Sequence, residues 1–190
     1  MKCSAGNVSG RWVVGSVLLV GFLLSGVAWW YRVNQSRTVL GLWGPQLAMR
    51  LERAEPVVVF RLQRTKTSGE EKGAGEEVVI GRSRYILGDS TRLSGRRGFL
   101  HFRHALVDSA AYDWDAPIPS EPRWQYLLRF GTGEETIELV LSVEDRTIAT
   151  TDLRRLAVLG PVAKKMQEYI EGSLDDAASL RPAAKSRHRE

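Results

Sequence analysis

The sequence has very few of the side chains on which metal binding and nucleophilic catalysis depend. Its 190 residues include one cysteine, Cys3, and three histidines. A single cysteine cannot form an intramolecular disulfide and excludes every cysteine-rich metal site. The chain also lacks the G-x-S-x-G elbow of serine hydrolases, and no segment repeats at a period of about twenty to fifty residues. The sequence therefore excludes disulfide scaffolds, repeat arrays and several common enzyme classes.

The composition is otherwise that of an ordinary globular protein with a modest excess of basic residues. There are 27 Lys and Arg against 22 Asp and Glu, and 43% of the residues are hydrophobic. Most basic residues are dispersed, apart from a modest cluster in residues 82–97 and the C-terminal tail. This dispersal makes nucleic acid an improbable partner, and anionic lipid headgroups are the better match for the same charges.

One stretch near the N-terminus, residues 12–31, is apolar and carries no charge over twenty residues. A helix of that length spans roughly 30 Å, the thickness of the hydrocarbon core of a bilayer. Aromatic residues lie at both ends, where amphipathic rings favour the membrane interface. We therefore expect a transmembrane helix or signal anchor at 12–31, after a short basic N-terminus at 1–11. The span residues are Trp12, Val13, Leu18, Leu19, Phe22, Leu23, Leu24, Trp29, Trp30 and Tyr31.

The same stretch leaves two alternatives open. Gly26 and Ala28 are small residues at the two positions that a signal peptidase reads, so cleavage after Ala28 would release a soluble exported domain. Because the apolar run continues to Tyr31, we favour an uncleaved anchor. Basic residues flank both ends, and the Lys/Arg count alone favours a cytoplasmic C-terminal part. The short N-terminus and signal-like layout favour export of residues 32–190, which is the orientation that we predict. Gly21 and Ser25 form one small-xxx-small pair, which predicts a weak route to a homodimer.

The remainder predicts a juxtamembrane linker at 32–43, one domain at 44–172 and a disordered basic tail at 173–190. Proline at a first helical position predicts helices that start at Gly44-Pro45 and at Gly160-Pro161, the latter ending at Gly172. A further helix is expected from Ser94 to about Asp108. Residues 65–77 are glycine-rich and charged, which predicts an exposed loop.

Strand propensity and alternation define the rest of the domain. The predicted strands are Val57–Leu62, Val78–Ile80, Tyr85–Leu87, Trp124–Phe130, Ile137–Val143 and Thr147–Thr150. The two longest are joined through Gly131-Thr132-Gly133 and are typical of an antiparallel hairpin with one buried face. We therefore expect an α+β fold in which a small antiparallel sheet of about five strands has helices packed on one face.

The region from Leu106 onward carries a resemblance. A helix ending in Leu106-x-Asp108-x-x-x-Tyr112, followed by a W-x-Y-x-L-R-F strand and an acidic hairpin, resembles uncharacterised small α+β domains of exported or membrane-anchored bacterial proteins. The resemblance covers residues 85–150 and implies the fold and export, with no assigned activity. The related domains often carry cysteine in their central strands, and this chain has none after Leu141.

His101, His104 and Asp108 are the only candidates for a metal site. On a helix they lie within about 60° of one another, and imidazole suits zinc. They also fit a solvated helix face opposite Phe99, and the nearby positive charge of Arg97 opposes a cation. We therefore expect no cofactor and no catalytic residues, with a metal-binding or enzymatic domain as the alternative.

The adjacent acidic pairs and the glycine pairs are typical of surface turns and not of catalytic or phosphate sites. The adjacent acidic pairs all fall in predicted loops, where neighbouring side chains point apart and stay solvated, whereas acid–base catalysis needs desolvated carboxyls. The glycine pairs at 73–75 and 131–133 lack the strand–loop–helix setting of a phosphate site. The sequence thus predicts a membrane-anchored, non-enzymatic module with a possible protein partner at the envelope.

Overall fold

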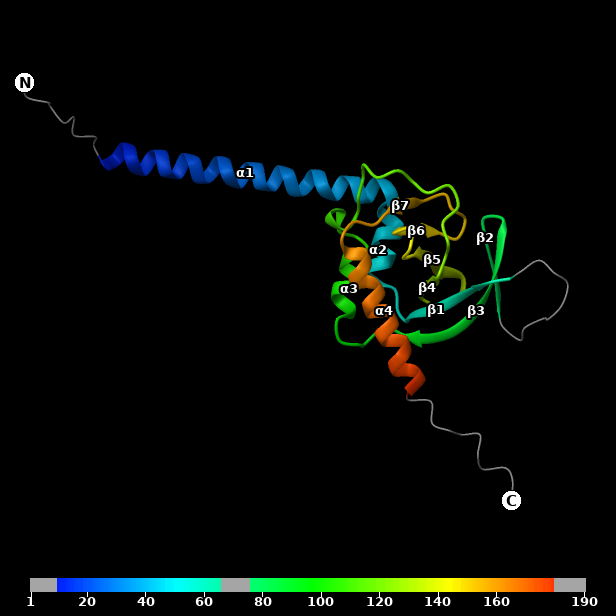
Figure 1. Cartoon of the computed structure of the whole chain (residues 1–190). Coiled ribbons are helices and arrows are strands. Elements are labelled where there is room, and N and C mark those ends of the chain that lie inside the picture. Colours follow the sequence, from blue (N-terminus) through cyan, green and yellow to red (C-terminus); the bar gives the residue numbers. More distant parts are fainter. Residues whose placement is uncertain (1–9, 66–75, 180–190) are drawn as a thin grey trace, which may run out of the picture. The chain divides into compact units, whose positions relative to one another are not determined.

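The chain consists of two compact units, Met1–Thr38 and Val39–Glu190. The computed structural model describes residues 10–65 and 76–179 (Figure 1). Helix α1 extends over Gly10–Trp43, so the expected linker at 32–43 is helical and its last five residues belong to the second unit. Polar residues such as Asn34 weaken a helix only slightly, and nothing in this segment is proline, so no residue forces a break.

The second unit is an α+β domain built on one antiparallel sheet, which confirms the predicted fold class. Its helical elements after α1 are α2 (Pro45–Arg53), α3 (Phe99–Ala105), η1 (Ser109–Ala111), η2 (Gly133–Glu135) and α4 (Val162–Ser179). Its strands are β1 (Val57–Arg64), β2 (Glu77–Ile80), β3 (Ser83–Arg92), β4 (Tyr126–Phe130), β5 (Ile137–Ser142), β6 (Thr147–Thr150) and β7 (Leu156–Val158). In space the order is β2-β3-β1-β4-β5-β6-β7.

The sheet has seven strands and not about five. Strand β7 was not predicted, because it has only three residues and follows a turn rich in charge. The strand predicted to end at Leu87, before Gly88, continues as β3 to Arg92. The β4–β5 hairpin is as predicted, with Tyr126 opposite Leu141 and Phe130 opposite Ile137.

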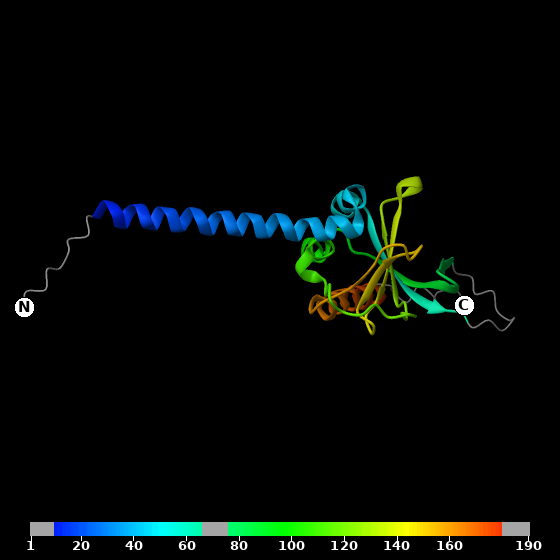
Figure 2. The same cartoon turned by 90° about the horizontal axis from the view of Figure 1, so that it is seen from above.

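The helices gather on one side of the sheet, as Figure 2 shows for α2, α3 and α4 in cyan, green and orange. The main core lies between them and the sheet. It includes Trp43, Leu51, Phe102, Leu106, Leu128, Phe130, Leu139, Ile148, Met166 and Ile170. Alternate residues of each strand supply this face, as expected for a sheet covered on one side by helices.

The opposite face of the sheet is also apolar, which the sequence reading did not anticipate. Leu127, Val140 and Ala149 are fully buried there, next to Tyr85 and Trp124. A β-bulge in β3 explains part of this second cluster. Between Phe60 and Leu62 the partner strand advances from Ser90 to Leu87, so β3 carries one extra residue at Gly88–Asp89.

The bulge switches the face that β3 presents to each cluster. Tyr85 and Leu87, before it, pack in the second cluster, whereas Leu93, after the strand, packs in the main core. Gly88 suits the bulge because a Cβ there would lie 3.2 Å from the backbone oxygen of Arg61. Gly88, which we expected at the end of a strand, therefore lies where two strands approach each other closely.

The two ends of the sheet meet because the sheet is strongly curled. A Cβ placed on Gly81, in the β2–β3 turn, would lie 2.7 Å from Cδ1 of Leu153, in the β6–β7 turn. These turns belong to the first and last hairpins in the spatial order. The second cluster is thus enclosed by the curl, and Leu153 and Leu156 pack against it from the far edge.

Two helix boundaries differ from the sequence reading. The helix expected from Ser94 begins only at Phe99, since Gly95 and Gly98 have positive φ of 85° and 90°. The final helix passes through Gly172 to Ser179 and buries Leu174, so residues 173–179 are not part of a disordered tail. Residues 180–190 of that predicted tail, and most of the loop predicted at 65–77, lie outside the described residues.

We predict that Gly81→Ala destabilises the domain more than Gly95→Ala. Both glycines have positive φ, 58° and 85°, which costs an alanine about 1–2 kcal/mol. Only Gly81 has a neighbour, Leu153, within contact distance of the added methyl group. Thermal unfolding of the full chain in detergent measures the difference, and equal losses for the two variants would contradict the contact between the sheet ends.

Candidate functional site

Helix α1 contains the strongest functional feature of the chain. Among the described residues, Trp12–Trp30 is the one helical stretch that is long and apolar enough to cross a membrane, with mean hydropathy 2.0 over 19 residues. None of this stretch is buried within the protein. Phe22 is 81% exposed and Trp12 is 76% exposed, values that are very unfavourable for such side chains in water.

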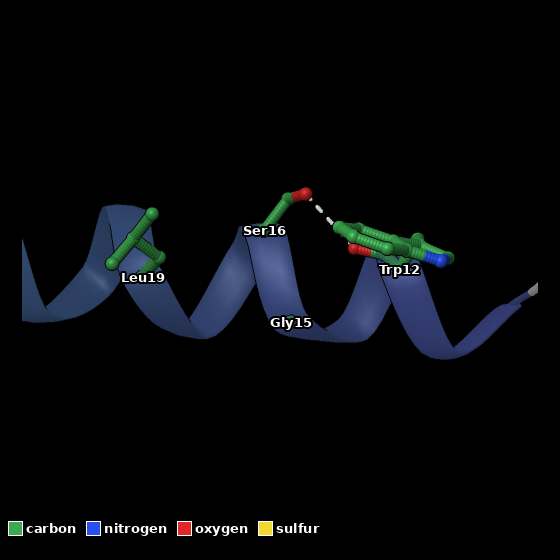
Figure 3. A pocket seen from close by; sticks show the side chains of 4 residues that line it. All are labelled: Trp12, Gly15, Ser16 and Leu19. Carbon is green, nitrogen blue, oxygen red and sulfur yellow. Dashed lines mark hydrogen bonds between the residues drawn. The ribbon is translucent and has the colours of Figure 1, made fainter.

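The two serines on this stretch bond to the backbone of the same helix. The hydroxyl of Ser16 donates to the backbone oxygen of Trp12 at 2.8 Å, and Ser25 donates to Gly21 at 2.9 Å. Figure 3 shows the first of these bonds at a surface pocket lined by Trp12, Gly15, Ser16 and Leu19. The two serine hydroxyls of this stretch are therefore paired with the helix's own backbone, as they must be in hydrocarbon.

The predicted dimer pair remains a prediction. A Cβ on Gly21 would meet nothing within 4 Å, so the surface there is open. The hydroxyl of Ser25, however, is directed to the oxygen of Gly21. It therefore does not need a partner helix to satisfy its donor.

The last turn of α1 lies in the core of the domain. Trp43 is fully buried, and its indole Nε1 donates to the backbone oxygen of Leu106 at 2.9 Å and to the hydroxyl of Tyr112 at 3.0 Å. That hydroxyl donates in turn to Leu106 at 2.6 Å. Burial is the main reason that the pKa of Tyr112 is strongly raised, so the phenol stays protonated and keeps this bond.

Two arginines from distant parts of the chain donate hydrogen bonds to backbone oxygens at the C-terminal ends of α1 and α2. Arg155, after β6, donates to the backbone oxygen of Trp43, the last residue of α1. Arg103 donates to the oxygens of Glu52 at 2.9 Å and Ala54 at 2.6 Å, at the end of α2. Carbonyls at a helix C-terminus lack intrahelical partners and carry partial negative charge, so a guanidinium stabilises them.

Arg103 was missed as a structural residue although the sequence contained a signal for it. It interrupts the apolar arc of Phe99, Phe102 and Leu106, and it is itself 9% exposed. Its guanidinium lies 4.6 Å from the centroid of the Phe99 ring. An arginine inside an apolar helix face is best read as a buried arginine that reaches backbone oxygens.

The structure does not assemble His101, His104 and Asp108 into one site. Both histidines are exposed on α3, but that helix ends at Ala105. Asp108 caps the next turn, where its carboxylate accepts a hydrogen bond from the backbone nitrogen of Ala110 at 3.0 Å. Within residues 10–65 and 76–179, no group of three His, Cys, Asp or Glu side chains has the geometry to hold a metal ion.

A charged cluster on the second face of the sheet is centred on Arg129. Its guanidinium donates to Glu76 at 2.7 Å and to Glu138 at 2.8 Å, and it lies 4.9 Å from the centroid of the Phe60 ring. The hydrogen bonds from Arg129 lower the pKa of the Glu76 carboxyl. An acid–base pair needs two carboxyls with separated pKa values, whereas here one cation binds both, which indicates a structural bridge.

The basic cluster predicted at residues 82–97 is drawn out along β3. Arg84 and Arg92 lie near opposite ends of this strand, about 26 Å apart at 3.3 Å per residue. Arg84 faces Glu77 at 3.7 Å, and Arg96 binds Asp176 at 3.2 Å. The strand therefore separates charges that the sequence places close together.

Comparison with known proteins gives no relative to this chain: no family model, no curated protein and no solved structure matches it.

We predict that Trp43→Ala costs about 3–5 kcal/mol of domain stability, because it removes a fully buried indole. Trp43→Phe keeps most of the ring but loses the donor to Leu106 and Tyr112, so it costs about 1–3 kcal/mol. Denaturant unfolding of the full chain in detergent measures both. A Trp43→Ala variant as stable as the wild type would show that α1 does not end in the core.

We predict that acid destabilises the wild type more than Glu76→Gln. The Glu76 pKa lies below its ordinary value of 4.5, so its bridge to Arg129 is fully present above that pH. The stabilisation is lost as the pH falls through the lowered pKa. Melting temperatures between pH 7 and pH 3 test this, and parallel curves for the two proteins would contradict it.

Proposed function

We propose that the protein is a membrane-anchored, non-enzymatic α+β module that serves as an interaction or structural component at the cell envelope, with residues 32–190 exported. The apolar, unburied stretch Trp12–Trp30 carries this proposal. Thirteen large hydrophobic side chains are exposed along it. At roughly 1.5 kcal/mol each, moving them from water into lipid gains on the order of 20 kcal/mol.

An uncleaved anchor is favoured over a cleaved signal by what cleavage would leave behind. Removal of residues 1–28 would place Trp29 and Trp30, 70% and 66% exposed, at the start of a protein in water. In a bilayer the same indoles fit the interface. Export is favoured by the resemblance of residues 85–150 to domains of exported proteins.

An interaction role is favoured by the way the domain uses its charged side chains. Arg103 and Arg155 bind helix ends, and Arg129 bridges two glutamates. Asp108 and Asp145 hold turns through backbone nitrogens, those of Ala110 and Arg123. These charged groups stabilise the fold and are therefore not candidates for reacting groups. This is why we assign the domain an interaction or structural role.

We predict that the full chain stays in the membrane pellet after alkaline extraction. Leu19→Lys with Leu23→Lys places two charges in the span, each costing about 2.5–3.5 kcal/mol, and should lower the fraction of the chain that stays in the pellet. Leu100→Lys is the matched control, because Leu100 is an exposed leucine in the domain, 75% accessible. It should remain in the pellet.

N-terminal sequencing of the extracted protein separates the two outcomes of export. A start within residues 1–11 supports the anchor, and a start at Trp29 would replace it by a cleaved signal. A wild-type chain that is unprocessed and yet fully soluble would overturn the proposal.

A further inference from the structure

Residues 77–87 form a ribbon at one end of the sheet, made of β2 and the first half of β3. The ladder between β1 and β4 stops at Arg61, opposite Tyr126, with one further bond from the nitrogen of Leu62 to Gln125 at 2.8 Å. Within the described part of the chain, the ribbon pairs only with the end of β1. It stands apart from the other strands at the right of Figure 1.

The ribbon covers one apolar face of the rest of the sheet. Its side chains Ile80, Tyr85 and Leu87 are buried in the second cluster. The opposing part of that cluster lies on or beside β4, β5 and β6, and we call it the covered face: Trp124, Leu127, Val140 and Ala149. These residues are buried because the ribbon supplies their apolar neighbours.

The tip of the ribbon is held by one side chain from the other end of the sheet. Leu153 lies against Gly81 and packs on the second cluster. Its φ is 56°, which side chains other than glycine rarely adopt. The β6–β7 turn keeps this conformation through bonds from the nitrogen of Leu153 to Thr150 at 2.8 Å and from the nitrogen of Arg154 to Asp152 at 3.1 Å. The leucine is therefore fixed in its turn, and the ribbon is the partner that can leave.

The base of the ribbon has a charged contact and a break in the ladder. Arg129 of β4 donates to Glu76, the residue before β2, at 2.7 Å. Both side chains are partly exposed, so water competes for this bond and its contribution is small. The bulge at Gly88 lies where the ribbon joins the rest of β3, and glycine permits backbone rotation there. The ribbon thus has one weak contact at each end and a hinge.

We propose that residues 77–87 are a lid that opens about Gly88, together with the end of β1, while the rest of the domain stays folded. Opening separates the tip from Leu153 and exposes the covered face. It breaks no ladder bond among β4, β5 and β6, because the ribbon pairs with none of them. Local opening of this kind is expected where few contacts close an element. This inference goes beyond the proposed function and does not depend on the anchor.

Thiol labelling of buried cysteines tests the lid. In a full chain with Cys3→Ser, Ala149→Cys places a thiol on the covered face, and Ala163→Cys is the matched control in the main core. The two alanines are 0% and 4% exposed. In detergent, we expect a water-soluble maleimide to label position 149 at least tenfold faster than position 163. Labelling at 149 should also change little at low urea concentrations, since a local opening exposes little surface.

A second pair of probes guards against a single misfolded variant. Val140 and Leu141 are neighbours on β5 that face the second cluster and the main core, respectively, and both are buried. Val140→Cys should again be labelled at least tenfold faster than Leu141→Cys.

A change at the tip tests the contact that holds the lid. Leu153→Ala removes the side chain that packs against Gly81, so the open form gains population and labelling at position 149 should become at least tenfold faster. Leu100→Ala is the matched control, because Leu100 is exposed on α3, and it should leave that rate unchanged.

Equal labelling within either pair of probes would overturn the proposal, because the covered face would then open only when the whole domain unfolds. A rate at position 149 that Leu153→Ala does not change would also overturn it, since the tip contact would then not hold the ribbon.

Discussion

The burial of Trp43 in the domain core is the constraint on which the rest of the structure depends. Its indole occupies the space where α1, Leu106 and Tyr112 meet, and both of its hydrogen bonds are internal. Because Val39 and Trp43 belong to the same helix as the apolar stretch, the residues just after the span are part of the domain's own fold. The domain therefore begins at the end of α1 and not at Gly44, and the boundary between anchor and domain lies inside a helix.

Helices α1 and α2 end in the same way, with a distant arginine bound to their last backbone oxygens. α1 and α2 each end without a side chain of their own to bind the last carbonyls, and an arginine from a distant segment supplies the missing donors: Arg155 for α1 and Arg103 for α2. Such contacts join segments that are 112 and about 50 residues apart in the chain. They form only when the sheet and helices are already in place, so they reinforce the complete fold more than any local element.

The local helices and strands could be predicted from the sequence, but the curl of the sheet that brings its two ends together could not. Alternation identified the β4–β5 hairpin, and proline at the first helical position located α2 and the start of α4. The second apolar cluster could not be foreseen, because it requires the curl that brings Gly81 to Leu153 and the bulge at Gly88. The candidate metal site depended on one helix that carries both His101 and Asp108 on the same face. Helix α3 ends at Ala105, so the two residues do not share a helix. The apolar arc of α3 could have marked Arg103 as buried, but the partners of Arg103 and Arg155 are distant backbone oxygens, which residue spacing cannot identify.

The segment 113–125 runs from the edge of the sheet at β7 to strand β4. Tyr112 bridges to Leu159, and the nitrogen of Asp113 donates to Val158, so the chain first covers the open edge of β7. It must then reach β4, three strands away in the sheet, a distance of about 14 Å. An extended, proline-restricted chain crosses that distance without needing the ladder hydrogen bonds that a strand would require. This crossing accounts for the prolines and for the half-buried residues Ala116, Pro119 and Pro122.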